Sequence, residues 1–353
     1  MGKMMRYKWI DIARGLAMLM VIVGHVSGSE PAFQAGQNFL FLGNLPIFFF
    51  FSGLLYRPKP LGERIKTNFN TLILLYIVFA LLILAYEWPA VKFGHASWSL
   101  TGTLLGALWA GGNNSTMPAG MMSLGAVWFF VALGLATIVF SCVQALVAKL
   151  PDRWRIITLV VISLGLFGLG LLAPAVTPWS LNAVLLSQVF LLGGYLAQRW
   201  MKQPWPFYGM VTMFVAGLAV WYWASQAGTF YLVSGTFTGP IWQLLLGAFG
   251  SIFALAGVAQ LIERGLWQMG DGIAWVGQNS AVVLFLHAFA ILILGKIVYG
   301  PTVGLWVQWY GRPIAWVLMV LLNTAPVIVM AYVALGLPIV RKIFTDRRWP
   351  MRF

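Results

Sequence analysis

Long apolar stretches alternate with short polar connections along the whole chain. A helix needs about 20 mostly apolar residues to cross the hydrocarbon core of a bilayer, which is about 30 Å thick. Stretches of this kind lie at residues 9–28, 38–56, 68–88, 123–147, 155–173, 181–198, 207–225, 240–262, 273–298 and 313–337. Residues 98–110 are also apolar but too few to span comfortably. The pattern predicts an all-α integral membrane protein, a bundle of about ten transmembrane helices forming one domain over residues 1–353, with no soluble domain.

Composition supports this prediction. Of the residues, 61% are apolar and only 8% are charged, whereas about a quarter are charged in a soluble domain. The first apolar stretch contains charged residues and lacks a small-residue cleavage site, so we expect a retained helix and no signal peptide. The single cysteine, Cys142, excludes an internal disulfide and a cysteine-based metal cluster. Three histidines without clustered carboxylates argue against a protein metal site.

The distribution of basic residues predicts the orientation. With ten spans, most of the 22 Lys and Arg residues fall in one set of connections, and cytoplasmic loops collect such residues. Both termini are therefore expected in the cytoplasm, in a multi-pass protein of the inner or plasma membrane. Segment 98–110 is expected to be interfacial or re-entrant, because an eleventh span would place the basic C-terminal tail outside. The net charge of +14 then reflects topology, and nucleic acid binding is not expected.

Tryptophans near the predicted span ends fit anchoring at the membrane interface, which implies no chemistry. They are Trp9, Trp88, Trp179, Trp205 and Trp349.

The first apolar stretch contains three ionisable residues, Asp11, Arg14 and His25. Such residues are costly inside a membrane, so each is a functional candidate. Asp11 and Arg14 are close enough to pair on a helix. Arg14 and His25 are separated by nearly three full turns, so they share one face about 16 Å apart along the axis. Asp11 lies within about 60° of the same stripe, which is therefore expected to face protein or a water-filled cavity.

Depth along the predicted spans separates the polar residues into two layers. His25 lies about 24 Å, and His287 about 21 Å, above the cytoplasmic end of its own span. Trp128 falls at a similar level, and Glu87 lies near the outer edge. The inner layer, about 6–10 Å from the cytoplasm, comprises Arg14, Ser52 and Asn279–Ser280. The sequence thus predicts histidines in the outer half of the membrane and an Arg, Ser and Asn layer in the inner half.

Structural interpretations compete with chemical ones for these residues. Asp11 and Arg14 equally fit an ion pair at the inner interface. His287 also fits an interhelical hydrogen bond, and Glu87 is expected to be solvated at the interface. No serine nucleophile elbow and no phosphate-binding glycine-rich motif occurs in the right context. A chemical role is favoured for His25 because of the sequence around it.

The first span resembles the opening helix of the acyltransferase 3 family, whose hallmark is an Arg or Lys, ten residues and then a His. Here these are Arg14 and His25. Residues 46–53 are similar to the family's Phe-rich run ending in Ser-Gly, residues 280–287 to its late Ser…His helix, and residues 128–130 to an aromatic patch on its fourth span. The resemblance covers the whole chain in span count and order, and is closest to the fucose 4-O-acetylase-like polysaccharide O-acetyltransferase group.

Two positions depart from the family pattern. The family often has paired arginines and then a proline after the second span, whereas here Arg64 and Lys66 precede Asn70-Thr71. The acetylase group tends to carry a His just before the Phe-rich run, where this chain has Asn44. Both departures concern donor contacts and acceptor identity.

The resemblance implies an O-acyltransferase that moves an acyl group, usually acetyl, from cytoplasmic acyl-CoA to a hydroxyl of a cell-surface or lipid-linked glycan. Acetyl-CoA would be a substrate, with no permanently bound cofactor and with membrane lipids as the surroundings. His25 would be a general base or a nucleophile that forms an acyl-imidazole, with Arg14 and His287 as further catalytic candidates. Donor-side candidates are Arg14, Ser52, Arg57, Arg64 and Lys66. Acceptor-side candidates are Asp11, Glu87, Trp128, Asn44 and Ser280.

A transporter or flippase is the alternative, with Arg14 and His25 lining a substrate or proton path. It predicts charged groups on several spans and often repeat symmetry. The ionisable groups instead concentrate on the first helix, and no internal repeat is found. The basic loops also follow from orientation alone, so they do not by themselves indicate a donor site.

Overall fold

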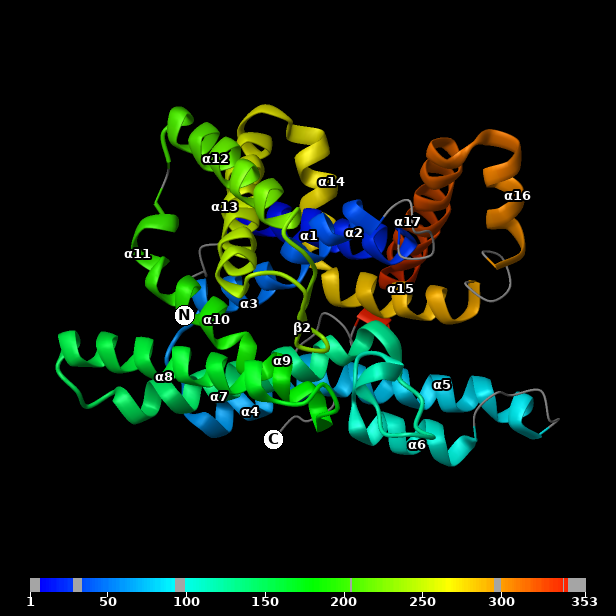
Figure 1. The fold of residues 1–353 in the computed structure, drawn as a ribbon, viewed down its shortest axis with the longest axis horizontal. Coiled ribbons are helices and arrows are strands. Elements are labelled where there is room, and N and C mark those ends of the chain that lie inside the picture. The colour runs from blue at the N-terminus through cyan, green and yellow to red at the C-terminus, as the bar shows by residue number, and fades with distance from the viewer. Residues whose placement is uncertain are drawn as a thin grey trace. The chain divides into compact units, whose positions relative to one another are not determined.

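A computed structural model describes residues 7–27, 34–92, 99–203, 205–294, 300–338 and 340–341. Trp349 and the basic residues beyond Arg341 lie outside these ranges. The described part is almost entirely helical (Figure 1), and its one sheet is the hairpin of β1 (Phe230–Tyr231) and β2 (Thr236–Phe237). The chain forms two compact units. The first comprises Met1–Phe51, Ala197–Phe230 and Phe237–Val333, and the second comprises Ser52–Leu196, Tyr231–Thr236 and Ala334–Phe353.

Seven helical segments of the described residues are long and apolar enough to cross a membrane. They are Gly36–Leu54, Leu61–Pro89, Gly125–Val147, Asp152–Leu172, Phe207–Ser225, Ile241–Gly265 and Arg312–Gly336. Two bent pairs, Pro178–Leu186 with Gln188–Leu196 and Gln268–Gln278 with Ser280–Ile291, raise the number to nine if each pair is one span. The predicted all-helical membrane fold is confirmed in this form. Ten spans, with both termini cytoplasmic, stay a prediction.

The apolar pattern did not show where helices break. The predicted span at 273–298 is divided into α14 (Trp267–Gln278) and α15 (Ser280–Leu294), with a bend of 74°. Asn279 lies at the bend with non-helical φ −106° and ψ 20°, and its side chain donates a hydrogen bond to the Trp275 carbonyl. Asparagine favours such local bonding over helix continuation, so a continuous helix there was a wrong expectation.

Two further predicted spans are interrupted. The 38–56 stretch has a one-residue break at Leu45 between α2 (Gln34–Asn44) and α3 (Pro46–Leu54), although Gly36–Leu54 still counts as one span; proline disfavours helical backbone at the residue before it. The 181–198 stretch is divided into α9 (Leu181–Leu186) and α10 (Gln188–Leu196), with a bend of 42° at Ser187. The segment predicted to be too short to span forms α6 (Leu100–Trp109).

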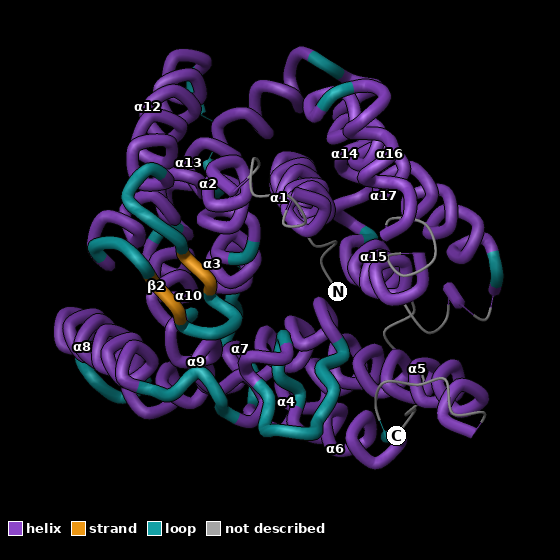
Figure 2. The backbone as a smooth tube through the Cα atoms, turned by 45° about the vertical axis from the view of Figure 1, so that its right-hand side comes forward, coloured by secondary structure: helices purple, strands orange, loops and turns teal. Residues whose placement is uncertain are grey.

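The first unit is built around α1 (Lys8–Ser27), which contacts α2, α13 (Ile241–Gly265), α14 and α15. Figure 2 looks nearly along α1 and shows these helices around it. Gly15 faces the Ile273 backbone and Gly277 faces the Asp11 backbone so closely that a Cβ at either glycine would collide. Small residues let membrane helices approach in this way. Outside this contact, α12 (Phe207–Ser225) packs along α13. The unit also includes α11 (Gln198–Met201), α16 (Gly300–Tyr310) and most of α17 (Arg312–Gly336).

The second unit contains α4 (Leu61–Asn68), α5 (Leu74–Lys92), α6, α7 (Trp128–Val147), α8 (Asp152–Leu172), α9 and α10. A π-helical segment, Phe69–Ile73, joins α4 to α5. Asn68 ties this junction to α7, since its amide donates hydrogen bonds to the Gly134 carbonyl and the Thr137 hydroxyl. Short 3₁₀ turns at Asn114–Thr116, Gly125–Val127 and Pro178–Ser180 complete the connections.

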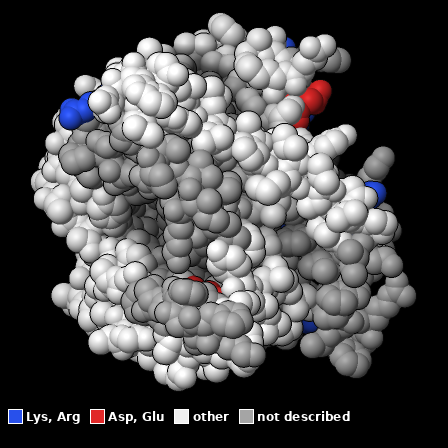
Figure 3. Space-filling view, turned by 90° about the vertical axis from the view of Figure 1, so that its right-hand side faces the viewer, with Lys and Arg blue, Asp and Glu red and all other residues white. Residues whose placement is uncertain are grey.

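Large apolar side chains are exposed along the candidate spans. Leu172 is 84% exposed, Val161 63% and Leu81 60%. The face drawn in Figure 3 likewise carries few charged side chains. Extended apolar surface is unfavourable in water but not against lipid tails. The exposed surface therefore agrees with a multi-pass membrane protein.

Candidate active site around His25 and His287

His25 lies in the last turns of α1, and its imidazole has a defined hydrogen-bonding state. Ring Nδ1 lies 2.7 Å from the Val21 carbonyl oxygen. A carbonyl oxygen can only accept, so Nδ1 carries the proton and donates it. In the neutral ring, Nε2 then holds the basic lone pair. The His25 side chain is exposed, so a water molecule or a substrate group can reach it.

His287 meets His25 from α15. The two ring centroids are 5.2 Å apart with an interplanar angle of 69°. His287 is only 1% exposed, and neither of its ring nitrogens has a hydrogen-bond partner among the described residues. An unpaired buried polar group costs about 1–3 kcal/mol. The pair therefore forms a polar site within an apolar helix bundle. A further hydrogen-bonding group, such as one from a ligand, would satisfy the unpaired nitrogens of His287.

Two residues of α2, Phe41 and Gln37, pack beside the end of α1 that carries His25, and neither was predicted from the sequence. The Phe41 ring packs edge-on against the imidazole, with centroids 5.8 Å apart. Gln37 is buried and its amide donates a hydrogen bond of 3.2 Å to the Gly24 carbonyl. Gly24 lacks the Cβ that would collide with the Phe41 ring. The available signal was the spacing of Gln37 and Phe41, which puts an amide and an aromatic ring on one helix face.

Asp11 and Arg14 lie on α1 nearer its Lys8 end. Asp11 is buried and accepts a hydrogen bond of 3.3 Å from the Gln278 amide, at the contact with α14. Arg14 is half-buried. Because α1 is unbroken from Lys8 to Ser27, Arg14 and His25 are separated by about 16 Å along it, as predicted. Asp11 thus takes part in helix packing as well as lying on the polar stripe.

Ser280 and Asn44 also belong to the first unit. Ser280 is half-buried at the first residue of α15, two turns and about 10 Å before His287 on the same helix. Asn44, the last residue of α2, is 2% exposed, and its Oδ1 has no partner among the described residues. Asn44 is therefore a second buried polar group able to accept a hydrogen bond from a ligand.

The remaining donor-side candidates, Ser52, Arg57, Arg64 and Lys66, belong to the second unit. Arg64 donates a hydrogen bond of 2.7 Å to the Arg57 carbonyl, and its guanidinium lies 4.9 Å from the Tyr56 ring centroid. Arg57 and Lys66 are exposed, and Ser52 is half-buried in α3. The structure joins Arg57 and Arg64 in one local contact.

Glu87 and Trp128 also lie in the second unit. Glu87 on α5 is 8% exposed and accepts a hydrogen bond of 2.9 Å from the Thr103 hydroxyl of α6. The expectation that it is solvated was therefore wrong, because α6 packs against α5 and covers the carboxylate. Trp128 begins α7, is buried, and packs edge-on against Phe129.

Within the described ranges, no group of three or more His, Cys, Asp and Glu side chains is placed to hold a metal ion. The histidine pair itself is suited to acid–base or nucleophilic chemistry, since an exposed imidazole with a basic Nε2 lies beside a second imidazole whose nitrogens are unpaired within the described structure.

Comparison with known proteins agrees with this chemistry. No match is found among curated proteins or among solved structures. The sequence model of the acyltransferase 3 family, described as an acyltransferase domain, matches residues 7–333 and so includes the helices that carry both histidines. The chain therefore belongs to the acyltransferase 3 family and is a membrane acyltransferase.

Proposed function

We propose that the protein is an O-acyltransferase of the cell membrane that moves an acyl group, usually acetyl, from cytoplasmic acyl-CoA to a hydroxyl of a cell-surface or lipid-linked glycan. Within the family we place it in the fucose 4-O-acetylase-like polysaccharide O-acetyltransferase group. The observation that carries the proposal is the pairing of His25 with His287. Membership of an acyltransferase family favours this function over transport.

The hydrogen bond to Val21 gives His25 its role. With Nδ1 donating to the carbonyl, Nε2 accepts the proton of the acceptor hydroxyl as its oxygen attacks the thioester carbonyl carbon. The C–S bond of the resulting tetrahedral intermediate then breaks, and the proton on Nε2 passes to the departing thiolate. His25 ends the cycle neutral. In the alternative sequence, Nε2 attacks the thioester carbonyl carbon, the C–S bond breaks and the thiolate departs, which leaves the acyl group on Nε2. The glycan hydroxyl oxygen then attacks the acyl carbon, the N–C bond breaks, and the hydroxyl proton passes to the thiolate, so that His25 again ends neutral.

His287 has the complementary role in this scheme. A neutral imidazole has one N–H donor and one acceptor nitrogen. Beside His25, the donor is suited to hydrogen-bond the developing oxyanion or the acceptor hydroxyl. The bound substrate would then satisfy a group that has no partner among the described residues of the free protein.

The orientation proposed from loop charge places the Lys8 end of α1 toward the cytoplasm and His25 toward the outside. Arg14 then lies on the donor side of His25, where its guanidinium is suited to orient the donor's amide or phosphate oxygens. Asn44 and Ser280 are proposed contacts of the acceptor. Glu87 and Trp128 are kept as further acceptor-side candidates.

His25→Ala tests the proposal directly. We expect acyl transfer from acetyl-CoA to fall by about 10²–10⁴-fold, the usual contribution of a general base, with thermal unfolding in detergent little changed. Asn323→Ala is the matched control, since its buried amide donates to the Met319 carbonyl of its own helix. Normal transfer by His25→Ala would contradict the mechanism. A radiolabelled acyl-protein that forms in the wild type and is absent in His25→Ala would select the acyl-imidazole route.

A further inference from the structure

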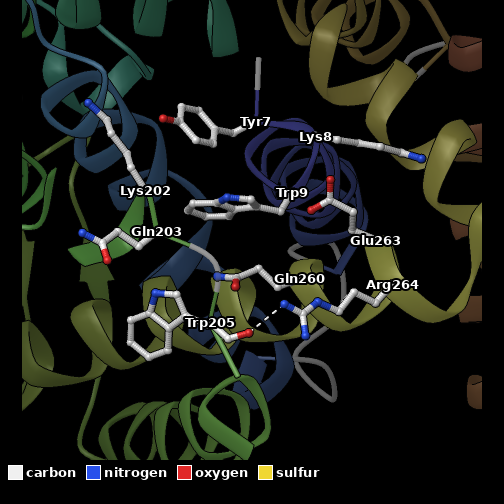
Figure 4. Close-up of a pocket in the computed structure, with 9 residues that line it drawn as sticks. All are labelled: Tyr7, Lys8, Trp9, Lys202, Gln203, Trp205, Gln260, Glu263 and Arg264. Carbon is white, nitrogen blue, oxygen red and sulfur yellow. Dashed lines mark hydrogen bonds between the residues drawn. The ribbon is translucent and has the colours of Figure 1, made fainter. Parts of the chain in front are cut away.

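A polar cavity lies in the first unit, at the opposite end of α1 from His25. Its volume is about 280 Å³, and it lies among the first residues of α1, the loop after α11 and the last turns of α13 (Figure 4). Trp9, Trp205 and Gln260 are among its lining residues. Trp9 lies about 24 Å along α1 from His25, so this cavity is separate from the histidine pair.

Gln260 gives the cavity a buried polar group without a partner. It is only 6% exposed, and its amide Nε2 has no hydrogen-bond partner among the described residues. In Figure 4 its side chain extends from α13 into the space between the two tryptophans. A buried donor without a partner is unfavourable, and a ligand acceptor such as a ring nitrogen, carbonyl or phosphate oxygen would pair it.

The charge around the cavity favours an anion. Lys8, Lys202 and Arg264 line it, against one carboxylate, Glu263. Glu263 interacts with Lys8, with the Trp9 backbone N–H and with Arg264, at the N-terminal end of α1 where a negative charge is stabilising. Lys8 is also paired with Asp271 at 2.7 Å. Three basic residues therefore line the cavity against one carboxylate, with Lys202 on the loop side and Arg264 on the α13 side.

Aromatic surface adjoins these cations. Arg264 donates a hydrogen bond of 2.7 Å to the Trp205 carbonyl, which uses one of the five N–H donors of its guanidinium. Trp9 is 6% exposed, so its indole lines an interior cavity and does not anchor the protein at the membrane interface as the sequence analysis expected. Flat aromatic surfaces beside basic groups suit a nucleobase that carries phosphates, because every base has a face on which an aromatic ring stacks.

We propose that this cavity binds the nucleotide end of acyl-CoA, with the adenine against Trp9 and Trp205, the Gln260 amide on an acceptor atom, and phosphate oxygens on Lys202 and Arg264. The inference rests on the proposed acyl-CoA donor and moves the nucleotide site from the loop after α3 to the start of α1. The pantetheine arm would then run along α1, past Arg14, toward His25. An anionic lipid headgroup presents the same phosphate chemistry without the base.

Binding of adenosine 3′,5′-bisphosphate and of CoA to the full-length protein, in nanodiscs of neutral lipid, tests the inference independently of turnover. We expect Gln260→Leu and Lys202→Ala each to raise the dissociation constants of the bisphosphate and of CoA by about tenfold, because each variant loses a charge-assisted or buried hydrogen bond. Two matched controls, Lys149→Ala and Lys59→Ala, remove exposed basic residues outside the cavity. They should leave both dissociation constants unchanged. Turnover of an acyl-pantetheine, which lacks the nucleotide, should be the same in all four variants.

The outcomes separate this inference from the proposed function. A wild-type protein that binds no bisphosphate, or a loss of binding in Lys59→Ala and not in Lys202→Ala, would overturn the site. If anionic lipid in the nanodisc displaces the nucleotide and Lys202→Ala weakens lipid binding alone, the cavity is a headgroup site and the inference is wrong. A third outcome is that Gln260→Leu and Lys202→Ala weaken nucleotide binding but the wild-type protein transfers no acyl group. That outcome would contradict the proposed function and leave the nucleotide site standing.

Discussion

His287 is a buried polar side chain without a hydrogen-bond partner among the described residues, an arrangement that lowers the stability of a folded protein. Its imidazole is 1% exposed, and both nitrogens lack a hydrogen-bond partner among the described residues. Buried polar groups in proteins are nearly always paired, so an exception beside an exposed, polarised His25 points to a site shaped for a ligand. Stability and activity should then respond in opposite directions when His287 is replaced.

We predict that His287→Leu leaves the unfolding temperature unchanged or raises it, since an unpaired buried polar group costs about 1–3 kcal/mol. The same variant should lower acyl transfer at least tenfold, because the group that stabilises the transition state is lost. Thermal unfolding in detergent and turnover with acetyl-CoA measure the two effects. A strongly destabilised variant with normal residual turnover would mean that His287 is a structural hydrogen-bonding group, the alternative left open by the sequence.

The sequence predicted a similar depth for His25 and His287, but neither their ring contact nor its surroundings. Residue depth along two predicted spans placed His25 and His287 at one level, because ionisable groups are rare in apolar helices and helix rise is constant. Gln37 and Phe41 were missed because neither residue type is unusual in a span. Glu87 was misjudged because its burial depends on α6, and the packing of one helix on another is not readable from hydropathy.

At the scale of elements, α1 is held against α14 by glycine. Gly277 lies against the Asp11 carbonyl and Gly15 against that of Ile273, so the two backbones touch where other helix pairs are separated by side chains. This contact fixes the helix that carries both Arg14 and His25. The position of the site therefore depends on residues that make no contact with a substrate.

We predict that Gly277→Ala destabilises the protein by about 1–3 kcal/mol, the usual cost of overpacking, and lowers transfer by displacing α1. The control is Gly272→Ala in the same helix, where an added Cβ meets no atom within 4 Å. That variant should be neutral or stabilising by up to about 1 kcal/mol, since alanine favours helix over glycine. Equal unfolding temperatures for the two variants would contradict the close packing.

Helix location was predictable from sequence, whereas helix continuity was not. Runs of apolar residues located most of the described spans to within a few residues, because the bilayer thickness sets helix length; the span predicted at 68–88 instead begins at Leu61. The bend at Asn279 depends on one side chain bonding to the Trp275 carbonyl, which leaves no mark on average hydropathy. This break places Ser280 at the start of a new helix and so sets the direction in which His287 enters the site.

At the scale of the whole molecule, orientation decides which substrate reaches which end of α1. The described helices supply seven to nine spans, and α1, with Asp11 and Arg14 within it, is outside that set. An even total places both chain ends on one side and an odd total on opposite sides. The basic loops favour ten, since cytoplasmic connections collect Lys and Arg.

Cysteine labelling in intact cells tests this orientation. Cys142 is the single cysteine, so replacing it with alanine gives a background into which Ser115→Cys, Arg153→Cys and Arg341→Cys are introduced one at a time, all at exposed positions. With ten spans, a membrane-impermeant maleimide should label position 115 in intact cells and positions 153 and 341 only after permeabilisation. Labelling of 341 but not of 153 from outside would indicate an odd number of spans between these two positions and contradict the ten-span arrangement, which has six there. Labelling of both 153 and 341, but not 115, would invert the orientation, place Arg14 on the outer side, and remove the route by which cytoplasmic acyl-CoA reaches His25.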